Sequence, residues 1–148
     1  MSMKASSWGL LGLGLILGYS APHWLGDAAH AAAPGAKVAC PWGPELDAVR
    51  AAPDNHKVLL ENDRVRVLDV TVLPGQREPL HAHCNASVLY VMQRGALRER
   101  NGEGRIVRDE AAAPATLPIT QWHATEPPHS VENPGTVPIR ILRVELKE

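Results

Sequence analysis

A series of short β-branched segments follows Pro53 and constrains the fold of this chain more than any other feature of its sequence. The segments are about 4 to 10 residues long, as strands are, and turn signals such as Asn101-Gly102 separate them. They span residues 56–60, 64–73, 87–92, 96–100, 105–108, 116–123, 130–133 and 138–146. Because no helix-length pattern lies between them, the sequence predicts an all-β domain, an antiparallel sandwich or barrel.

Within two of these segments the apolar residues switch from one face of the expected strand to the other, which is a change of phase in the alternation. Val65 and Val67 share one phase while the apolar residues from Leu68 onward take the other, and the same switch separates Ile141 from Leu142. Since side chains alternate across a strand, the switch predicts a β-bulge or a strand that is buried on both faces.

The N-terminus carries the pattern of a secretory leader. Lys4 precedes an apolar run at residues 8–19, and small residues follow, with Ala-His-Ala at 29–31 as the cleavage motif. The alternative is an uncleaved membrane anchor, because residues 5–26 hold no charge. Glycines and Pro22 suit a spanning helix poorly. We therefore expect an exported, periplasmic protein that has no stable membrane association once the leader is removed.

This interpretation divides the chain into a signal peptide (residues 1–31), a linker with a short helix (32–54) and one β-barrel domain (55–148). Residues 44–52 fit the helix, because proline is tolerated in a first helical turn and Pro53 ends it. The formal net charge of −1 gives no reason to expect binding to nucleic acid. The chain has no phenylalanine, so Val, Leu and Ile must build the core.

Cys40 and Cys84 are the two cysteines. Export would expose them to an oxidising compartment, where a disulfide is allowed. The sequence does not tell whether their Cα atoms lie within bridging distance. A free buried thiol and a metal-ligating Cys84, next to His83, stay open as alternatives.

Histidines cluster in two windows of the chain. His81 and His83 are two residues apart, so both imidazoles point to the same face of an extended strand. His123 and His129 lie on a second segment that can complete a metal site. The opposing interpretation is a set of hydrogen-bonded core histidines that binds no metal.

Residues 75–95 resemble the first motif of the cupin superfamily, Gly-x5-His-x-His-x(3,4)-Glu-x6-Gly, with Gly75, His81, His83 and Gly95 at the motif spacing. Residues 129–133, His-Ser-Val-Glu-Asn, resemble the end of the second motif, Pro-x-Gly-x2-His-x3-Asn. The resemblance covers residues 55–148. It implies a small single-domain cupin of the type 2 kind, an antiparallel double-stranded β-helix or jelly-roll barrel.

By the same resemblance, one divalent transition metal (Fe, Zn, Ni, Mn or Cu) is held by His81, His83 and His129. Two departures from the motifs stand out: Val88 occupies the glutamate position, and Ala124 and Glu126 replace the proline and glycine ahead of the last histidine. Three neutral imidazoles leave a divalent ion its full charge. An anionic substrate or hydroxide is therefore expected in the open coordination positions.

Two residues are candidates for a fourth ligand, and two for contact with a substrate. Glu126 and His123 lie on the segment that delivers His129, although a solvated carboxylate and a surface or supporting histidine are the alternatives. Tyr90 shares the phase of Val88, which predicts that it lines the interior as a substrate contact. Trp122 is expected at the rim of the pocket. Core packing is the alternative for both aromatic residues.

The leading functional hypothesis is a small-molecule metalloenzyme of the dioxygenase, isomerase or lyase type. The alternative is a non-catalytic module that binds or senses a small ligand, with or without metal. The sequence holds no Gly-x-Ser-x-Gly, phosphate loop or Cys-x-x-Cys, which argues against the chemistries that use them. Cupins resembling this one often pair through an edge strand or the N-terminal segment, so a homodimer is a further expectation.

Overall fold

The computed structural model describes residues 40–112 and 116–147. The predicted signal peptide, residues 1–31, and the linker up to residue 39 lie outside the described residues. In the part of the chain that is described, neither helical segment has the length and apolar character needed to cross a membrane.

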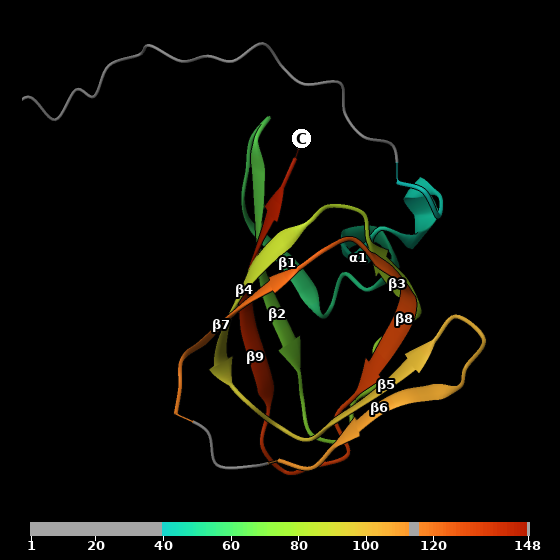
Figure 1. The fold of residues 1–148 in the computed structure, drawn as a ribbon, viewed down its shortest axis with the longest axis vertical. Coiled ribbons are helices and arrows are strands. Elements are labelled where there is room, and N and C mark those ends of the chain that lie inside the picture. Colours follow the sequence, from blue (N-terminus) through green and yellow to red (C-terminus); the bar gives the residue numbers. More distant parts are fainter. Residues whose placement is uncertain (1–39, 113–115, 148) are drawn as a thin grey trace, which may run out of the picture. The chain divides into compact units, whose positions relative to one another are not determined.

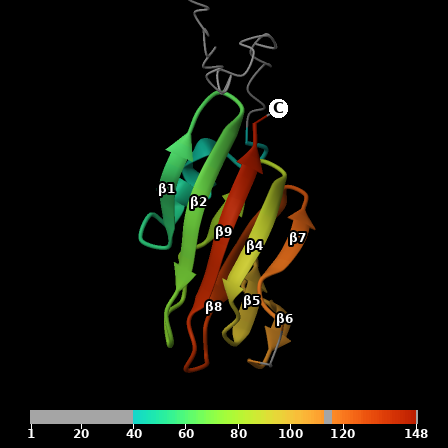
Figure 2. The ribbon, with the colours of Figure 1, turned by 90° about the vertical axis from the view of Figure 1, so that its left-hand side faces the viewer.

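The strands of the described residues form two antiparallel sheets that face each other (Figure 1). The five-stranded sheet has the order β1 (His56–Glu61), β2 (Val65–Val72), β9 (Ile139–Leu146), β4 (Ser87–Gln93) and β7 (Ile119–His123). Figure 2 shows this sheet face-on, with the other sheet behind it. The four-stranded sheet has the order β3 (His81–His83), β8 (Glu126–Glu132), β5 (Leu97–Asn101) and β6 (Ile106–Glu110). The predicted antiparallel jelly-roll barrel is confirmed.

The predicted short helix is divided into two turns. A 3-10 turn, η1 (Pro44–Leu46), leads into α1 (Ala48–Ala51), and the Asp47 side chain caps α1 by accepting from the Val49 amide over 3.1 Å. Asp47 also forms a β-bridge with Ala82 in β3. The segment before the barrel therefore packs directly on the strand that carries His81 and His83.

The phase switches have a cause other than the predicted bulge. β2 and β9 pair without a register shift from Val65 to Val72, and Val65 and Val67 lie half-buried on the outer face. The inward positions beside them hold Arg66 on β2 and Glu145 on β9, both buried. The switch therefore marks the place where the interior of the barrel changes from apolar to charged.

Two motif residues have structural roles at one end of the barrel. A Cβ at Gly95 would lie 2.2 Å from the Val137 carbonyl oxygen, so only glycine fits. The Asn133 amide donates to the carbonyls of Val72 (3.0 Å) and Val137 (2.8 Å), and its Oδ1 accepts from the Gly135 amide. Asn133 thus fixes the turn between β8 and β9.

Cys40 and Cys84 form a disulfide. This excludes the two alternatives left open by the sequence, a free buried thiol and a metal-ligating Cys84. The bond joins the segment before η1 to the residue that follows His83, and so reinforces the contact of that segment with β3.

Candidate metal centre

The three histidines expected from the motifs lie together inside the barrel. β3 places the buried rings of His81 and His83 with their centroids 5.2 Å apart. β8 pairs with β3 so that His129 lies directly across from His81, with ring centroids 4.6 Å apart. The four-stranded sheet therefore supplies all three predicted ligands.

A fourth histidine, His56, completes the cluster from the opposite sheet. It is the first residue of β1 and is buried in a strand that is otherwise exposed. Its ring centroid lies 4.6 Å from that of His81 and 5.2 Å from that of His83, and the potential ligand atoms of these three residues all lie within 4.8 Å of one another. His56 was not expected from the sequence, because no motif spacing connects it to His81.

Each of the four imidazoles has its Nδ1 atom facing an acceptor. The acceptors are Ala52 O for His56 (3.3 Å), Pro79 O for His81 (2.9 Å), Glu145 Oε1 for His83 (3.0 Å) and Pro127 O for His129 (2.8 Å). A carbonyl or carboxylate oxygen only accepts, so the proton of each neutral ring resides on Nδ1. Each Nε2 lone pair is then free to bind a metal, the arrangement that supporting contacts typically create around metal-binding histidines.

Burial keeps three of these imidazoles, His56, His81 and His83, in the neutral form that metals require. It lowers the pKa of His56 to about 4 and that of His81 to about 3, and it holds the pKa of His83 well below its ordinary value. The neighbouring histidines and Arg143 lower these pKa values further, because they disfavour another positive charge. The donor set therefore fits a divalent transition metal, and imidazole suits Zn, Cu, Fe and Ni.

A chain of buried ionic contacts supports His83 from behind. Glu145 accepts from His83 Nδ1 through Oε1 and from Arg66 Nε through Oε2 at 2.6 Å. Arg66 in turn donates to both carboxylate oxygens of Asp47, at 3.0 and 2.8 Å. Burial raises the pKa of Glu145, whereas Arg66 and Arg143 favour its charged form. The ring of His83 is thus held by a carboxylate that the segment before α1 helps to position.

The glutamate position of the first motif must be reassigned. Val88 is half-buried on the outer face of β4, whereas Ser87 is fully buried and pairs across the sheet with Glu145. The motif allows three or four residues between its second histidine and its glutamate, and three residues after His83 lead to Ser87. One residue more than the motif has then lies between this position and Gly95, and a register shift between Val91 and Gln93 accommodates it. The carboxylate missing from this position lies next to it, on β9.

The structure does not bring Tyr90 and Trp122 to the cavity. Both share the outward phase of Val88, and their side chains are 42% and 62% exposed. Their neighbours Leu89 and Gln121 point inward and line the cavity. Tyr90 was expected to face the interior because Val88 was placed there. Moving the inward position from Val88 to Ser87 is a shift of one residue, and such a shift turns each following side chain of the strand to the other face.

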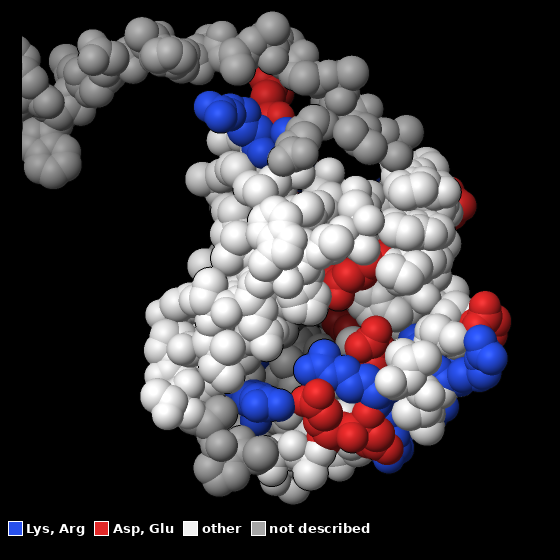
Figure 3. All heavy atoms as spheres, in the orientation of Figure 1, with Lys and Arg blue, Asp and Glu red and all other residues white. Residues whose placement is uncertain are grey.

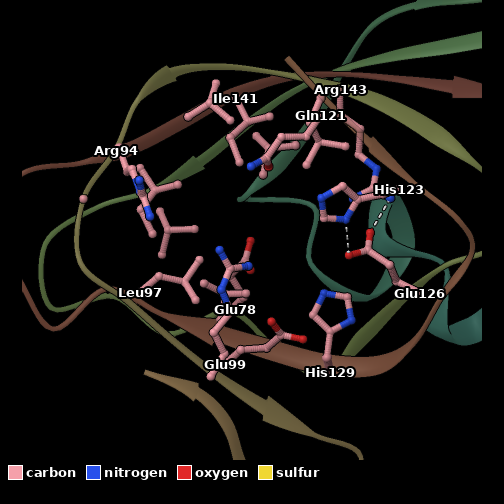
Figure 4. A pocket seen from close by; sticks show the side chains of 18 of the residues that line it. Glu78, Arg94, Leu97, Glu99, Gln121, His123, Glu126, His129, Ile141 and Arg143 are labelled. Carbon is pink, nitrogen blue, oxygen red and sulfur yellow. Dashed lines mark hydrogen bonds and ion pairs between the residues drawn. The ribbon is translucent and has the colours of Figure 1, made fainter. Parts of the chain in front are cut away.

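Glu126 and His123, the two candidates for a fourth ligand, bind each other instead. His123 Nδ1 donates to Glu126 Oε1 over 2.9 Å, and Arg143 Nη2 donates to Oε2 over 2.5 Å. Burial alone would raise the pKa of Glu126, but Arg143 and His123 hold it below its ordinary value. Figure 4 shows His129, His123 and Glu126 at one side of the cavity, with Arg94 and Leu97 across from them.

The histidines open onto a cavity of about 120 Å³ between the two sheets. Aliphatic, polar and charged side chains line it together, and charged side chains gather around the hollow in Figure 3. At the partly exposed end, Arg94 and Arg108 share the carboxylate of Glu110. Glu78 also lines the cavity, where burial raises its pKa to about 8, and its Oε1 has no hydrogen-bond partner among the described residues.

Comparison with known proteins agrees with this architecture. No protein-family model and no curated protein matches the chain. Among solved structures, a cupin domain from Bordetella pertussis Tohama I is 25% identical, with a TM-score of 0.53, over 63% of this chain and 92% of that one. A cupin family protein with a double-stranded β-helix fold from Methanocaldococcus jannaschii is 10% identical, with a TM-score of 0.46, over 62% of this chain and 78% of that one.

Proposed function

The chain is a member of the cupin superfamily, and we propose that it is a metal-dependent enzyme that acts on a small molecule. The observation that carries the proposal is the cluster of four imidazoles, each with its Nδ1 atom bound to an acceptor. His56, His81 and His83 form its compact part, and His129 adjoins His81. A divalent ion held there would act as a Lewis acid on a substrate in the cavity.

His123 supports a catalytic role for the cavity rather than ligand storage. Its Nδ1 proton is held by Glu126, so its Nε2 atom is left free to accept a proton, the same orientation that a carboxylate imposes on a catalytic histidine in hydrolases. His123 lines the cavity beside Arg143 and Glu126. We assign to Nε2 of His123 the uptake and return of a substrate proton.

Of the reaction classes that the fold allows, this assignment favours isomerase or lyase chemistry over dioxygenase chemistry. Isomerisation by proton transfer moves a proton from a carbon to another atom of the substrate, and elimination passes a carbon-bound proton to a base while the leaving group departs with its electron pair. A positioned base contributes about 10²- to 10⁴-fold to such steps. We further propose that the protein is exported, that it acts in the periplasm, and that it pairs as a homodimer.

Metal content tests the proposal. The full chain, produced without a histidine tag, would be reconstituted separately with Fe²⁺, Zn²⁺, Ni²⁺, Mn²⁺ and Cu²⁺, and the bound metal measured by elemental analysis. We expect one equivalent of metal in the parent and in His123→Ala, and its loss in His56→Ala and His81→Ala. A parent that retains no metal, or a His81→Ala variant that retains all of it, would overturn the proposal.

A further inference from the structure

The outer face of the five-stranded sheet is apolar, although the solvent-facing side of an antiparallel sheet is normally polar. Residues directly opposite each other on neighbouring antiparallel strands have their side chains on the same face. Through such pairs a single row of side chains crosses all five strands, and every member of it is apolar. From β1 to β7 the row consists of Leu60, Val67, Val144, Val88 and Trp122.

Other apolar side chains extend this row in both directions along the strands. On one side Val65 of β2 pairs with Leu146 of β9. On the other side Leu142 of β9 pairs with Tyr90 of β4, and Met92 lies two residues beyond Tyr90. These residues and the row together form the apolar outer face, which is turned toward the viewer in Figure 2. Its most exposed members are Leu60 (50%), Tyr90 (42%), Met92 (38%) and Trp122 (62%).

The changes of phase in β2 and β9 produce this face. The support of His83 explains why Arg66 and Glu145 occupy inward positions, where both are buried. It does not explain why their neighbours Val67 and Val144, which point outward, are apolar. A sheet face in contact with water is normally given polar residues. The pattern therefore indicates that the outward positions are covered by another surface.

The apolar outer face is large enough for a stable contact between two copies of the chain. β2 has eight residues, which span about 26 Å at about 3.3 Å per residue. The five strands span about 24 Å at about 4.8 Å per strand. Stacking two such faces covers about 600 Å² on each copy, or about 1,200 Å² in total. Specific and stable protein interfaces begin at about this size.

The charges at the two ends of the face also suit a second copy. At one end Asp69 lies opposite Lys57 and 4.0 Å from Arg140. At the other end Lys147 pairs with Glu61. A border of a single sign would repel an identical chain, whereas each of these ends carries both signs. In Figure 3 charged side chains gather over β5 and β6 of the other sheet, and the side formed by β4 and β7 is white.

We propose that two copies of this chain stack through the apolar outer face, sheet against sheet, around a two-fold axis. Such an interface uses the same patch on both copies, and stacked sheets pack about 10 Å apart. The inference rests on the homodimer included in the proposed function, and it adds the surface through which the copies meet. It also gives Tyr90 and Trp122 a role, because exposed aromatic residues often supply much of the binding energy of an interface.

Sedimentation velocity of the full chain over a wide range of concentrations tests the proposal. We expect the parent to be a dimer. Trp122→Ala removes a side chain that is mostly exposed in the single copy, and it should raise the dissociation constant of the dimer about thirtyfold or more. Val88→Lys places a positive charge in the middle of the apolar outer face of both copies, and this variant should be a monomer.

Val107→Lys is the matched control for Val88→Lys. Val107 is also a valine on an antiparallel strand, but it lies on β6 of the other sheet, where it is exposed. We expect Val107→Lys to form dimers like the parent. Far-ultraviolet circular dichroism shows whether each variant is folded. If Val88→Lys does not fold, Trp122→Ala alone decides.

The possible failures are distinguishable. If the parent is a monomer at every concentration, the proposed homodimer fails and this inference fails with it. If the parent is a dimer and both Trp122→Ala and Val88→Lys dimerise as strongly as Val107→Lys, the copies meet elsewhere and this inference alone is overturned. An equal loss of the dimer in Val107→Lys would also overturn it. The metal centre is tested separately, by metal content.

Discussion

The disulfide between Cys40 and Cys84 should account for a large part of the stability of the domain. It closes a loop with a sequence separation of 44 residues. In the loop-entropy model, a cross-link of this span stabilises the folded state by about 4 kcal/mol, because it restricts the unfolded chain. The free energy of unfolding of a domain is about 5 to 15 kcal/mol, so reduction should remove a substantial fraction of it.

Urea denaturation of the oxidised and the reduced full chain measures this contribution without any change of side chain. Unfolding would be followed by far-ultraviolet circular dichroism, with and without dithiothreitol. With a denaturant slope of about 2 kcal/mol per molar urea, the midpoint should fall by about 2 M on reduction. The variant Cys40→Ser/Cys84→Ser should unfold like the reduced parent and should not respond to dithiothreitol.

The result that would refute this reasoning is a midpoint that barely moves when the bond is reduced. Such a result would mean that the other contacts of the N-terminal segment hold it in place in the folded state, and that the unfolded chain gains little freedom from reduction. Asp47, which bridges Ala82 and binds Arg66, would be the main source of those contacts. A decrease in the variant without a decrease on reduction would instead assign the effect to the serine side chains.

Two further predictions concern buried carboxyl groups. Glu145→Gln should lower Zn²⁺ affinity about 10- to 100-fold, measured in competition with a chromophoric chelator, because the contact that orients His83 loses its charge. Glu110→Gln, at the cavity entrance, is the control. An equal loss of affinity in Glu110→Gln would refute the role of Glu145 in orienting His83. Burial raises the pKa of Glu78 to about 8 in the folded protein, from 4.5 in the unfolded chain. As pH rises, the unfolded chain therefore loses this proton at a lower pH than the folded protein does. The free energy of unfolding falls between these two values. Relative to the parent, Glu78→Gln should therefore gain on the order of 3 kcal/mol in unfolding free energy between pH 5 and pH 8. Urea denaturation at the two pH values measures this gain, and a constant difference would contradict it.

Much of the fold could be predicted from alternation and turn residues, because these signals are local. The segments that contain β2, β4, β5 and β9 were located within a few residues of their observed bounds. β3 was not among the predicted strands, since three residues are too few for a periodic pattern. β8 begins at Glu126, ahead of the predicted start, and Pro127 and Pro128 conceal this because proline is uncommon inside strands.

The candidate site was only partly predictable, because its residues come together through long-range pairing. His81, His83 and His129 have motif spacing, and the structure places them in one cluster. His56 reaches the cluster only because the first residue of β1 meets the strand of the other sheet that carries His81 and His83, which no local pattern encodes. One local signal was present but misinterpreted. The phase switches in β2 and β9 mark charged residues at inward positions, which is where the support of His83 originates.

The position of the carboxylate decides how the charge of the site is distributed. A glutamate at position 87 would bind the metal directly and remove one unit of its charge. In this chain Ser87 stands there, and the nearest carboxylate, Glu145, reaches the Nδ1 side of His83 instead. From that side it polarises the imidazole and offsets part of the charge across the ring, but it occupies no coordination position. A metal held by the histidines would therefore keep the coordination position that a glutamate at position 87 would fill, and that position would be available to a ligand in the cavity that the histidines line.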